Sequence, residues 1–464
     1  MSITAAIIAE YNPFHKGHAY QIAKTREITG ADYIVVIMSG DYVQRGKPAV
    51  MDKYLRTRMA LEGGADLLFE LPLRYATASA SDFAFGACSI LSRLGCIDYL
   101  SFGSEEGNLD KLQKAADLFT LEPPRFSQVL KREMKNGQPY PAARAAAWKE
   151  YTGEDPSFLS EPNNILAISY LMAMKKTGSS IKPVTVKRIG NAYHDAALPE
   201  NGTCMSAAAM RTFLEKACYL KRNPTDPLAN IDADTAADTD TDTDTDTDTD
   251  TAADADTDTD AALDPGADAN LFQALSAYID GPESRCILTD ELGRSYPVTA
   301  EDFWPMLRYR LVMESGNLET YADLTPALAA RIRRKAYQAA GYEDLAEALK
   351  TREITRTRID RALLHLLLDI KKDKQPRETE QPAAVPSYVR LLGMKRSHSD
   401  LLSAMLDHKG IPILTKAVPD ILQGQDLQDY MTEIRAADLY HAAVHMKYGG
   451  QAPLEELRRP LICL

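Results

Sequence analysis

Two histidines near the start of the chain lie in a turn that could hold an anion. His15 and His18 flank Gly17, where an apolar run over residues 3–9 gives way to a helical pattern over residues 17–29. The apolar run is typical of a strand buried on both faces. Free N–H groups and the positive dipole end of a helix bind phosphate, and two imidazoles could stabilise charge that develops on it. The spacing alone also fits surface histidines, but its place between a first strand and a first helix favours the phosphate site.

The elements that would position this turn continue an alternation of strands and helices. Strands are predicted at residues 33–38, 65–71, 98–102 and 184–187. Helices are predicted at residues 52–63, at residues 81–94 (with Ser81 as N-cap) and from a start within residues 161–166 to residue 176. Strands with helices between them predict an open parallel sheet, that is, a Rossmann-like α/β domain. Ligands of such sheets bind beyond the carboxyl ends of the strands. Residues 12–18, 39–46 and 103–105 are therefore expected at one rim.

The second rim segment carries one acid and one fixed cation. Asp41 could orient a nucleophile or hold Mg²⁺ through water, and Arg45 could clamp a carboxylate or a phosphate through two hydrogen bonds. The alternative is an ordinary surface loop with a salt bridge.

The acidity of the chain is confined to one segment. The net charge is −13, but residues 232–268 contain 15 aspartates and no Lys or Arg, so the rest of the chain carries −13 + 15 = +2. Nucleic-acid affinity follows local basic patches, so the total does not exclude an RNA partner. The Thr-Asp repeat has no apolar face, and residues 224–268 are predicted to be a disordered acidic insert. It separates a first domain, residues 1–223, from a mainly helical second domain, residues 269–464.

Other features indicate a cytoplasmic protein. No stretch approaches 18 apolar residues, and the N-terminus lacks a basic signal-peptide region. Six cysteines without CxxC spacing suggest buried thiols in a reducing compartment. His441 and His445 lie four residues apart, but no third ligand is near them in the sequence, so no metal site is expected.

Basic residues cluster in the predicted helices of the second domain. Such a cluster forms either a solvated helical face or a surface that binds an RNA backbone. The candidates for RNA contact are Arg331, Arg333, Arg334, Lys335, Arg356 and Arg358. Residues 387–393 could form a strand that returns to a small mixed unit.

Four strings give the first domain a specific resemblance. HKGH after a first strand resembles the HxGH signature of the nucleotidyltransferase superfamily. The longer EYNPFHKGH, with MSGDYVQRGKPA at residues 38–49, FELP at 69–72 and FGSE at 102–105, is similar to the bacterial tRNA(Met) cytidine acetate ligase family. The similarity covers most of residues 1–215 and thins over residues 290–410.

The resemblance implies an activity and a set of site residues. ATP would activate acetate as acetyl-adenylate, with Mg²⁺ offsetting the triphosphate charge, and the acetyl group would pass to N4 of the wobble cytidine of elongator tRNA(Met). The catalytic candidates are His15, His18, Asp41 and Arg45, with Arg45 as the anchor for acetate. The candidate ATP contacts are Ile7, Ile8, Ala9, Glu10, Tyr11, Asn12, Pro13, Phe14, His15, Lys16, Gly17, His18, Ala19, Tyr20, Gly103, Asn163, Arg188, Ile189, Ser206 and Arg211. Alanines replace most of the hydroxyls that the superfamily carries near Ser206.

Two other functions stay open at this point. A small-molecule nucleotidyltransferase, moving AMP or CMP onto a phosphorylated metabolite, would use the same N-terminal motif but leaves the second domain without a role. A non-catalytic RNA-binding protein with a relic nucleotide site would explain the missing hydroxyls near Ser206. No protein partner is evident from the sequence.

Overall fold

The computed structural model describes residues 2–188, 207–222, 279, 281–351, 354–372, 385–416, 421–450 and 454–464. The predictions made for the acidic insert, for Ile189 and for Ser206 lie outside these residues. The division of the chain at residues 223 and 269 stays a prediction.

One sheet organises the described part of the chain, in the strand order β5-β4-β1-β2-β3-β6-β7, with β8 paired to β6. The first five strands of that path are parallel to one another, which confirms the predicted open parallel sheet. The strands are β1 Thr4–Ala9, β2 Tyr33–Ser39, β3 Leu67–Leu71, β4 Tyr99–Ser104, β5 Lys182–Lys187, β6 Val389–Met394, β7 Ile413–Leu414 and β8 Ile462–Cys463.

The far edge of the sheet comes from the C-terminal part of the chain. β6 pairs antiparallel with β3, and β7 and β8 pair with β6. The predicted strand over residues 387–393 exists as β6, but the small mixed unit predicted for it does not, because β6 pairs with β3 and all six of its residues are buried in the main sheet. A single run of apolar residues cannot reveal which distant strand it will pair with.

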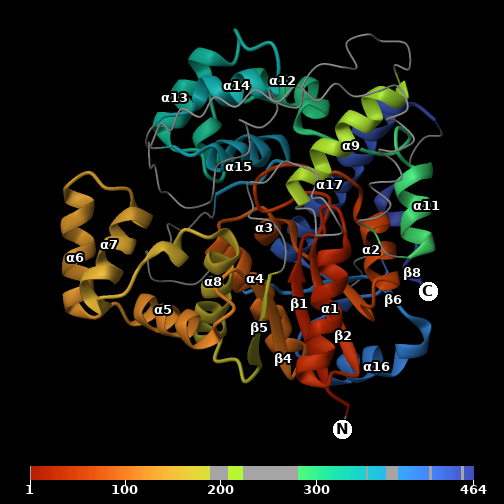
Figure 1. The fold of residues 1–464 in the computed structure, drawn as a ribbon. Coiled ribbons are helices and arrows are strands. Elements are labelled where there is room, and N and C mark those ends of the chain that lie inside the picture. Colours follow the sequence, from red (N-terminus) through yellow and green to blue (C-terminus); the bar gives the residue numbers. More distant parts are fainter. Residues whose placement is uncertain are drawn as a thin grey trace, which may run out of the picture.

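Helices cover both faces of the sheet (Figure 1). They are α1 Lys16–Thr29, α2 Lys53–Glu62, α3 Leu73–Ala76, α4 Ala80–Leu94, α5 Leu109–Leu121, α6 Pro124–Lys135, α7 Tyr140–Thr152, α8 Pro162–Lys176, α9 Ala207–Arg222, α11 Pro282–Asp290, α12 Trp304–Met313, α13 Pro326–Lys335, α14 Tyr342–Leu349, α15 Arg356–Leu367, α16 Ser399–His408 and α17 Gly424–Tyr448. The short 3₁₀ turn η7, Glu456–Arg458, follows α17. The N-cap of α4 is Ser79 and not the predicted Ser81, because the Ser79 side chain accepts the backbone N–H of Asp82.

Alternate residues of β1 enter two separate cores, as expected for a strand buried on both faces. Ala6 and Ile8 of β1 pack with α4, α5, α8 and α16 on one face. Ala5 and Ile7 pack with α1, α2, α9 and α11 on the other.

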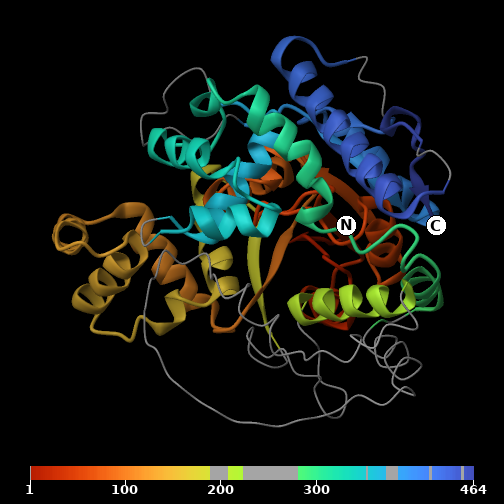
Figure 2. The same cartoon turned by 90° about the horizontal axis from the view of Figure 1, so that it is seen from above.

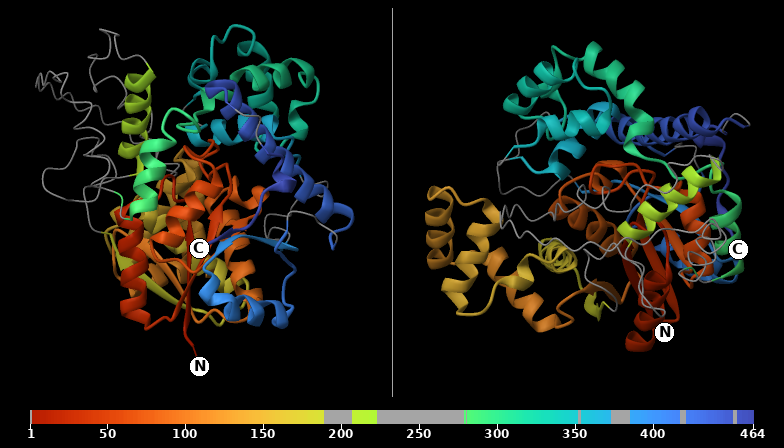
Figure 3. Two further views of the ribbon diagram at one scale, coloured as in Figure 1. Left: turned by 90° about the vertical axis from the view of Figure 1, so that its right-hand side faces the viewer. Right: turned by 45° about the horizontal axis from the view of Figure 1, so that its top comes forward.

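Two helical groups stand beside the carboxyl edge of the parallel strands. α12 to α15 form one group above this edge, with a core of its own (Figures 1 and 3). α5 to α7 project from one side of the molecule, where α6 packs on α7 (Figure 2). The turn that follows β1 lies at this same edge.

Candidate active site

His15 is the N-cap of α1, and it and His18 fix each other in place. Nδ1 of His15 accepts a hydrogen bond from the backbone N–H of Gly17 at 3.0 Å, and Nδ1 of His18 accepts one from the backbone N–H of His15 at 3.3 Å. The rings stack with centroids 3.9 Å apart. A neutral imidazole has one N–H and one lone pair. Both rings therefore carry the proton on Nε2, and both Nε2–H groups can donate to a ligand.

The surroundings keep both histidines neutral. Burial, aided by the charges of Arg188 and Arg211, lowers the pKa of His15 to about 3. Burial, aided by His15 and Arg188, also lowers the pKa of His18 well below its usual value. At neutral pH the turn therefore presents N–H dipoles, and the positive charge of the site comes from the two arginines.

Two aromatic side chains, those of Tyr11 and Phe14, pack against the histidine turn. The ring of Tyr11 lies edge-on to His18, with centroids 4.8 Å apart, and Phe14 lies 5.0 Å from Tyr11. Both side chains are buried. Phe14 in turn rests on Gly63 at the end of α2, where an added Cβ would lie 2.2 Å from the ring. The histidines therefore have little freedom to move away from the helix N-terminus.

Arg56 of α2 joins the loops after β1 and β2. Its guanidinium is fully buried and donates to the backbone oxygens of Glu10 at 2.7 Å, Ser39 at 3.1 Å and Gly40. The side chain of Asn12 adds a second link by accepting the backbone N–H of Val50 at 2.7 Å. We did not predict Arg56 from the sequence, because a single arginine within a helical pattern carries no signal of burial.

The ends of β4 and β5 contribute a second group of side chains. Arg188 Nη1 donates to Asn163 Oδ1 at 3.3 Å, and an added Cβ on Gly103 would lie 3.5 Å from Arg188 Cγ. The carboxylate of Glu105 accepts the backbone N–H groups of Asn163 and Asn164 at the start of α8. Glu105 therefore caps α8, and the side chain of Asn163 can turn towards Arg188.

These contacts show which predicted residues the fold brings together. Arg211 of α9 donates to the backbone oxygen of Asn12 at 3.1 Å, and both Arg188 and Arg211 act on His15. The turn, Asn163, Arg188 and Arg211 thus share one side of the carboxyl edge. Their roles towards ATP stay predictions.

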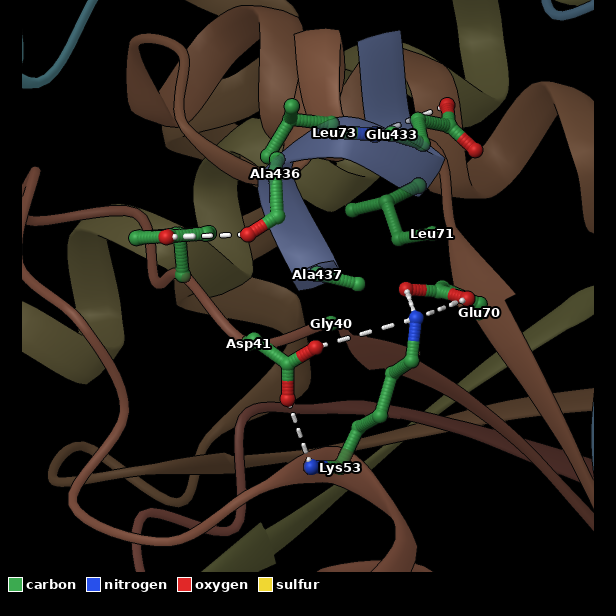
Figure 4. Close-up of a pocket in the computed structure, with 10 residues that line it drawn as sticks. Gly40, Asp41, Lys53, Glu70, Leu71, Leu73, Glu433, Ala436 and Ala437 are labelled. Carbon is green, nitrogen blue, oxygen red and sulfur yellow. Dashed lines mark hydrogen bonds and ion pairs between the residues drawn. The ribbon is translucent and has the colours of Figure 1, made fainter. Parts of the chain in front are cut away.

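Asp41 belongs to a buried ion cluster. Its carboxylate accepts the backbone N–H of Lys53 at 2.8 Å and lies 3.7 Å from Lys53 Nζ, which also contacts Glu70 at 2.7 Å (Figure 4). The same Nζ lies 2.8 Å from Glu456. Asp41 is only 3% exposed. The hypothesis that Asp41 orients a nucleophile or holds Mg²⁺ therefore needs correction, since its charge already compensates that of Lys53. Arg390 of β6 completes the cluster through Glu456, at 2.6 Å.

The predicted RNA-binding cations divide into structural and exposed groups. Arg356 is 5% exposed, and its guanidinium pairs with Asp360 and Glu343. It joins α14 to α15 and is not placed to contact RNA, so that prediction is wrong.

The remaining cations of this set lie on α13 and α15. Arg331 donates to the backbone oxygens of Ala348 and Lys350, and Arg333 pairs with Glu319. Arg334 and Lys335 are exposed, and Arg358 is half-buried.

Neither a metal-binding cluster nor a membrane span is found in the described part of the chain. Over those residues, no three His, Cys, Asp or Glu side chains gather as they would around an ion. None of the described helices is long and apolar enough to cross a membrane.

Comparisons with known proteins agree on one family. The model of the HIGH Nucleotidyl Transferase family matches residues 1–252 and 268–452. A tRNA(Met) cytidine acetate ligase of Acetivibrio thermocellus is 35% identical, over 94% of this chain and 93% of its own. One of Caldicellulosiruptor saccharolyticus is 33% identical over 98% of both chains.

Two solved structures resemble the whole described fold. The apo structure of Thermotoga maritima TmcAL superposes with a TM-score of 0.79 at 25% identity, covering 100% of this chain and 99% of that one. The structure of the same protein with alpha-thio ATP gives a TM-score of 0.78 over the same shares.

Proposed function

This chain belongs to the tRNA(Met) cytidine acetate ligase family of HIGH nucleotidyltransferases, and we propose that it joins acetate to a cytidine of tRNA(Met) at the expense of ATP. The full-length match to named ligases and the likeness to a homologue bound to an ATP analogue support this activity. The acceptor would be N4 of the wobble cytidine of the elongator tRNA, and the enzyme would work in the cytoplasm beside that tRNA.

The observation that carries the proposal is the pair of neutral imidazoles at the N-terminus of α1. An acetate oxygen would attack the α-phosphorus of ATP, pyrophosphate would leave, and acetyl-adenylate would form. The Nε2–H groups of His15 and His18 and the backbone N–H groups of α1 would donate to phosphate oxygens as charge develops. Arg188 and Arg211 supply the fixed positive charge. Positioning and electrostatics would therefore provide most of the rate enhancement.

Mg²⁺ would enter with the nucleotide as Mg–ATP. It would offset triphosphate charge, and its ligands would be phosphate oxygens and water, because the described residues offer no carboxylate cluster for it. The half-buried Arg45 is the proposed anchor for acetate, because its charge acts on the carboxyl group of Glu10, at the rim where the acetate would bind.

The tRNA would lie against α12 and α13, above the active edge of the sheet. Arg334 and Lys335 are exposed there, and Tyr309 and Tyr337 are 64% and 74% exposed. Cations that meet phosphates beside rings that stack on bases are typical of proteins that bind RNA loops.

Labelled acetate tests the proposal directly. The protein is mixed with ATP, Mg²⁺ and unmodified elongator tRNA(Met), with other tRNAs as controls. Label should enter that tRNA alone and only with ATP. His18→Ala removes one donor and should lower acetate-dependent ATP–pyrophosphate exchange by roughly 10²–10³. Exchange without labelled tRNA would reassign the acceptor. ATP binding without either signal would refute acetate activation and favour transfer to a phosphorylated metabolite.

A further inference from the structure

Transfer of the acetyl group needs a proton acceptor, and the two histidines do not provide one. The N4 amine that attacks an acyl-adenylate must lose a proton as the new bond forms. Each histidine lone pair lies on Nδ1, where it already accepts a backbone N–H, from Gly17 or from His15. Both rings act as donors in this arrangement, so the base must come from another group at the carboxyl edge.

Four carboxylates of the described residues follow parallel strands of the sheet at this edge, and three of them are already engaged. Glu106, after β4, pairs with Lys111 at 3.0 Å. Asp41, after β2, is buried against Lys53. Glu105, after β4, uses both oxygens to cap α8.

Glu10, after β1, is different. Its Oε1 accepts one hydrogen bond, from the backbone N–H of Gln44 at 2.8 Å, and the residue is partly exposed. No described residue donates to its other oxygen.

The setting of Glu10 places it beside the phosphate site. It directly precedes the histidine turn, and Arg56 fixes its backbone oxygen at 2.7 Å. The charge of Arg211 acts on both Glu10 and His15, so the two groups share one neighbourhood.

We propose that Glu10 is the general base of the acetyl-transfer step. The N4 lone pair forms a bond to the acetyl carbonyl carbon, the carbon–oxygen bond to phosphate breaks, AMP leaves with that electron pair, and the N4 proton passes to the Glu10 carboxylate. This assignment rests on the proposed ligase function and deepens it.

The charged groups around Glu10 suit this role. Burial raises the pKa of its carboxyl group, while the Gln44 N–H and the guanidinium groups of Arg45, Arg211 and Arg56 oppose the rise. Among the described residues, Tyr170 of α8 is a further titratable group on which the charge of Glu10 acts, and burial raises the pKa of its phenol, so that it stays protonated. A base is most effective when its pKa lies near the working pH.

The test separates the two half-reactions in the full-length enzyme. Glu10→Gln keeps an oxygen for the Gln44 N–H but cannot accept the proton. Glu10 is also a candidate ATP contact, so the readout is the ratio of the two half-reactions: acetate-dependent ATP–pyrophosphate exchange should fall much less than transfer, and the exchange that remains shows that the variant folds. Single-turnover transfer from preformed acetyl-adenylate to tRNA(Met) should fall by about 10²–10⁴. The wild-type transfer rate should rise with pH as Glu10 ionises, and the variant should lose this rise.

Glu106→Gln is the matched control, since Glu106 lies on the same rim but pairs with Lys111 at 3.0 Å. It should leave both half-reactions unchanged. Wild-type transfer by Glu10→Gln, or an equal loss of exchange and transfer, would overturn the assignment of the base. If the wild-type enzyme performs exchange but acetylates no tRNA, the proposed function itself fails, and the base assignment fails with it.

Discussion

Replacing Lys53 by Met should destabilise the protein by about 3–5 kcal/mol, the range for removing one partner of a buried ion pair. The ammonium group lies within 3.7 Å of Asp41 and within 2.8 Å of Glu70 and Glu456, and all four side chains are less than 10% exposed. Met fills most of the same volume, so the loss reports on charge and not on a cavity.

The surrounding contacts favour the lower half of this range. After the substitution, Glu456 still has Arg390 at 2.6 Å, and Glu70 has the same guanidinium at 3.8 Å. Asp41 loses most, because its Oδ2 has no hydrogen-bond partner to compensate for the missing charge. The Asp41 carboxylate thus keeps only the hydrogen bond from the backbone N–H of residue 53, and the other two carboxylates are partly compensated by Arg390.

Urea denaturation at pH 7 measures the effect, with Arg58→Met as the control from the same helix. Arg58 pairs with Glu283 at 3.7 Å, but about half of its side chain is exposed, so its loss should cost at most about 1 kcal/mol. If Lys53→Met unfolds within 1 kcal/mol of Arg58→Met, the cluster does not hold the C-terminal segment to the sheet through charge.

Two further predictions concern pH and packing. Burial raises the pKa of Glu433 to about 8, so the folded protein holds a proton that the unfolded chain releases above its usual value near 4.5. The free energy of unfolding should therefore fall as pH rises towards 8, by about 1.4 kcal/mol per pH unit, and Glu433→Gln should remove this dependence. Urea titrations at pH 6 and pH 8 measure it for both proteins. The same loss of unfolding free energy in wild type and variant would contradict the prediction. Gly63→Ala would drive a Cβ into Phe14, which should cost about 1–3 kcal/mol and weaken ATP binding measured by calorimetry, whereas Gly316→Ala meets nothing within 4 Å and should change neither quantity. Equal ATP affinities for the two variants would show that Phe14 does not position the histidines.

The sequence predicted the half of the sheet that is built from local alternation. Strands over residues 33–38 and 98–102 were located because short apolar runs between helices have few other structural solutions. The strand over residues 387–393 was predicted, but its antiparallel pairing with β3 was not, because Val389–Met394 lies far along the chain from β3. A local apolar pattern can identify a segment as a buried strand, but which strand it pairs with depends on the whole fold.

The same limit explains the errors in the site. The histidine turn can be recognised from a few consecutive residues, and it was predicted correctly at the start of α1. Arg356 was predicted to contact RNA because it lies in a run of basic residues. Its guanidinium instead forms ion pairs with Asp360, one helical turn later, and with Glu343 on another helix. Asp41 was misread for the same reason, since its charge is paired with that of Lys53 on α2, in a cluster whose other members come from β3, β6 and η7.

The pairing of β3 with β6 has a consequence for synthesis on the ribosome. Residues 67–71 emerge roughly 300 residues before residues 389–394, an interval on the order of 15–60 s at bacterial elongation rates. Until then, the growing chain exposes the hydrogen-bonding edge of a fully buried strand, which is a template for pairing with another chain. A nascent histidine turn can therefore form early, but the sheet that carries it is protected only when the last part of the polypeptide arrives.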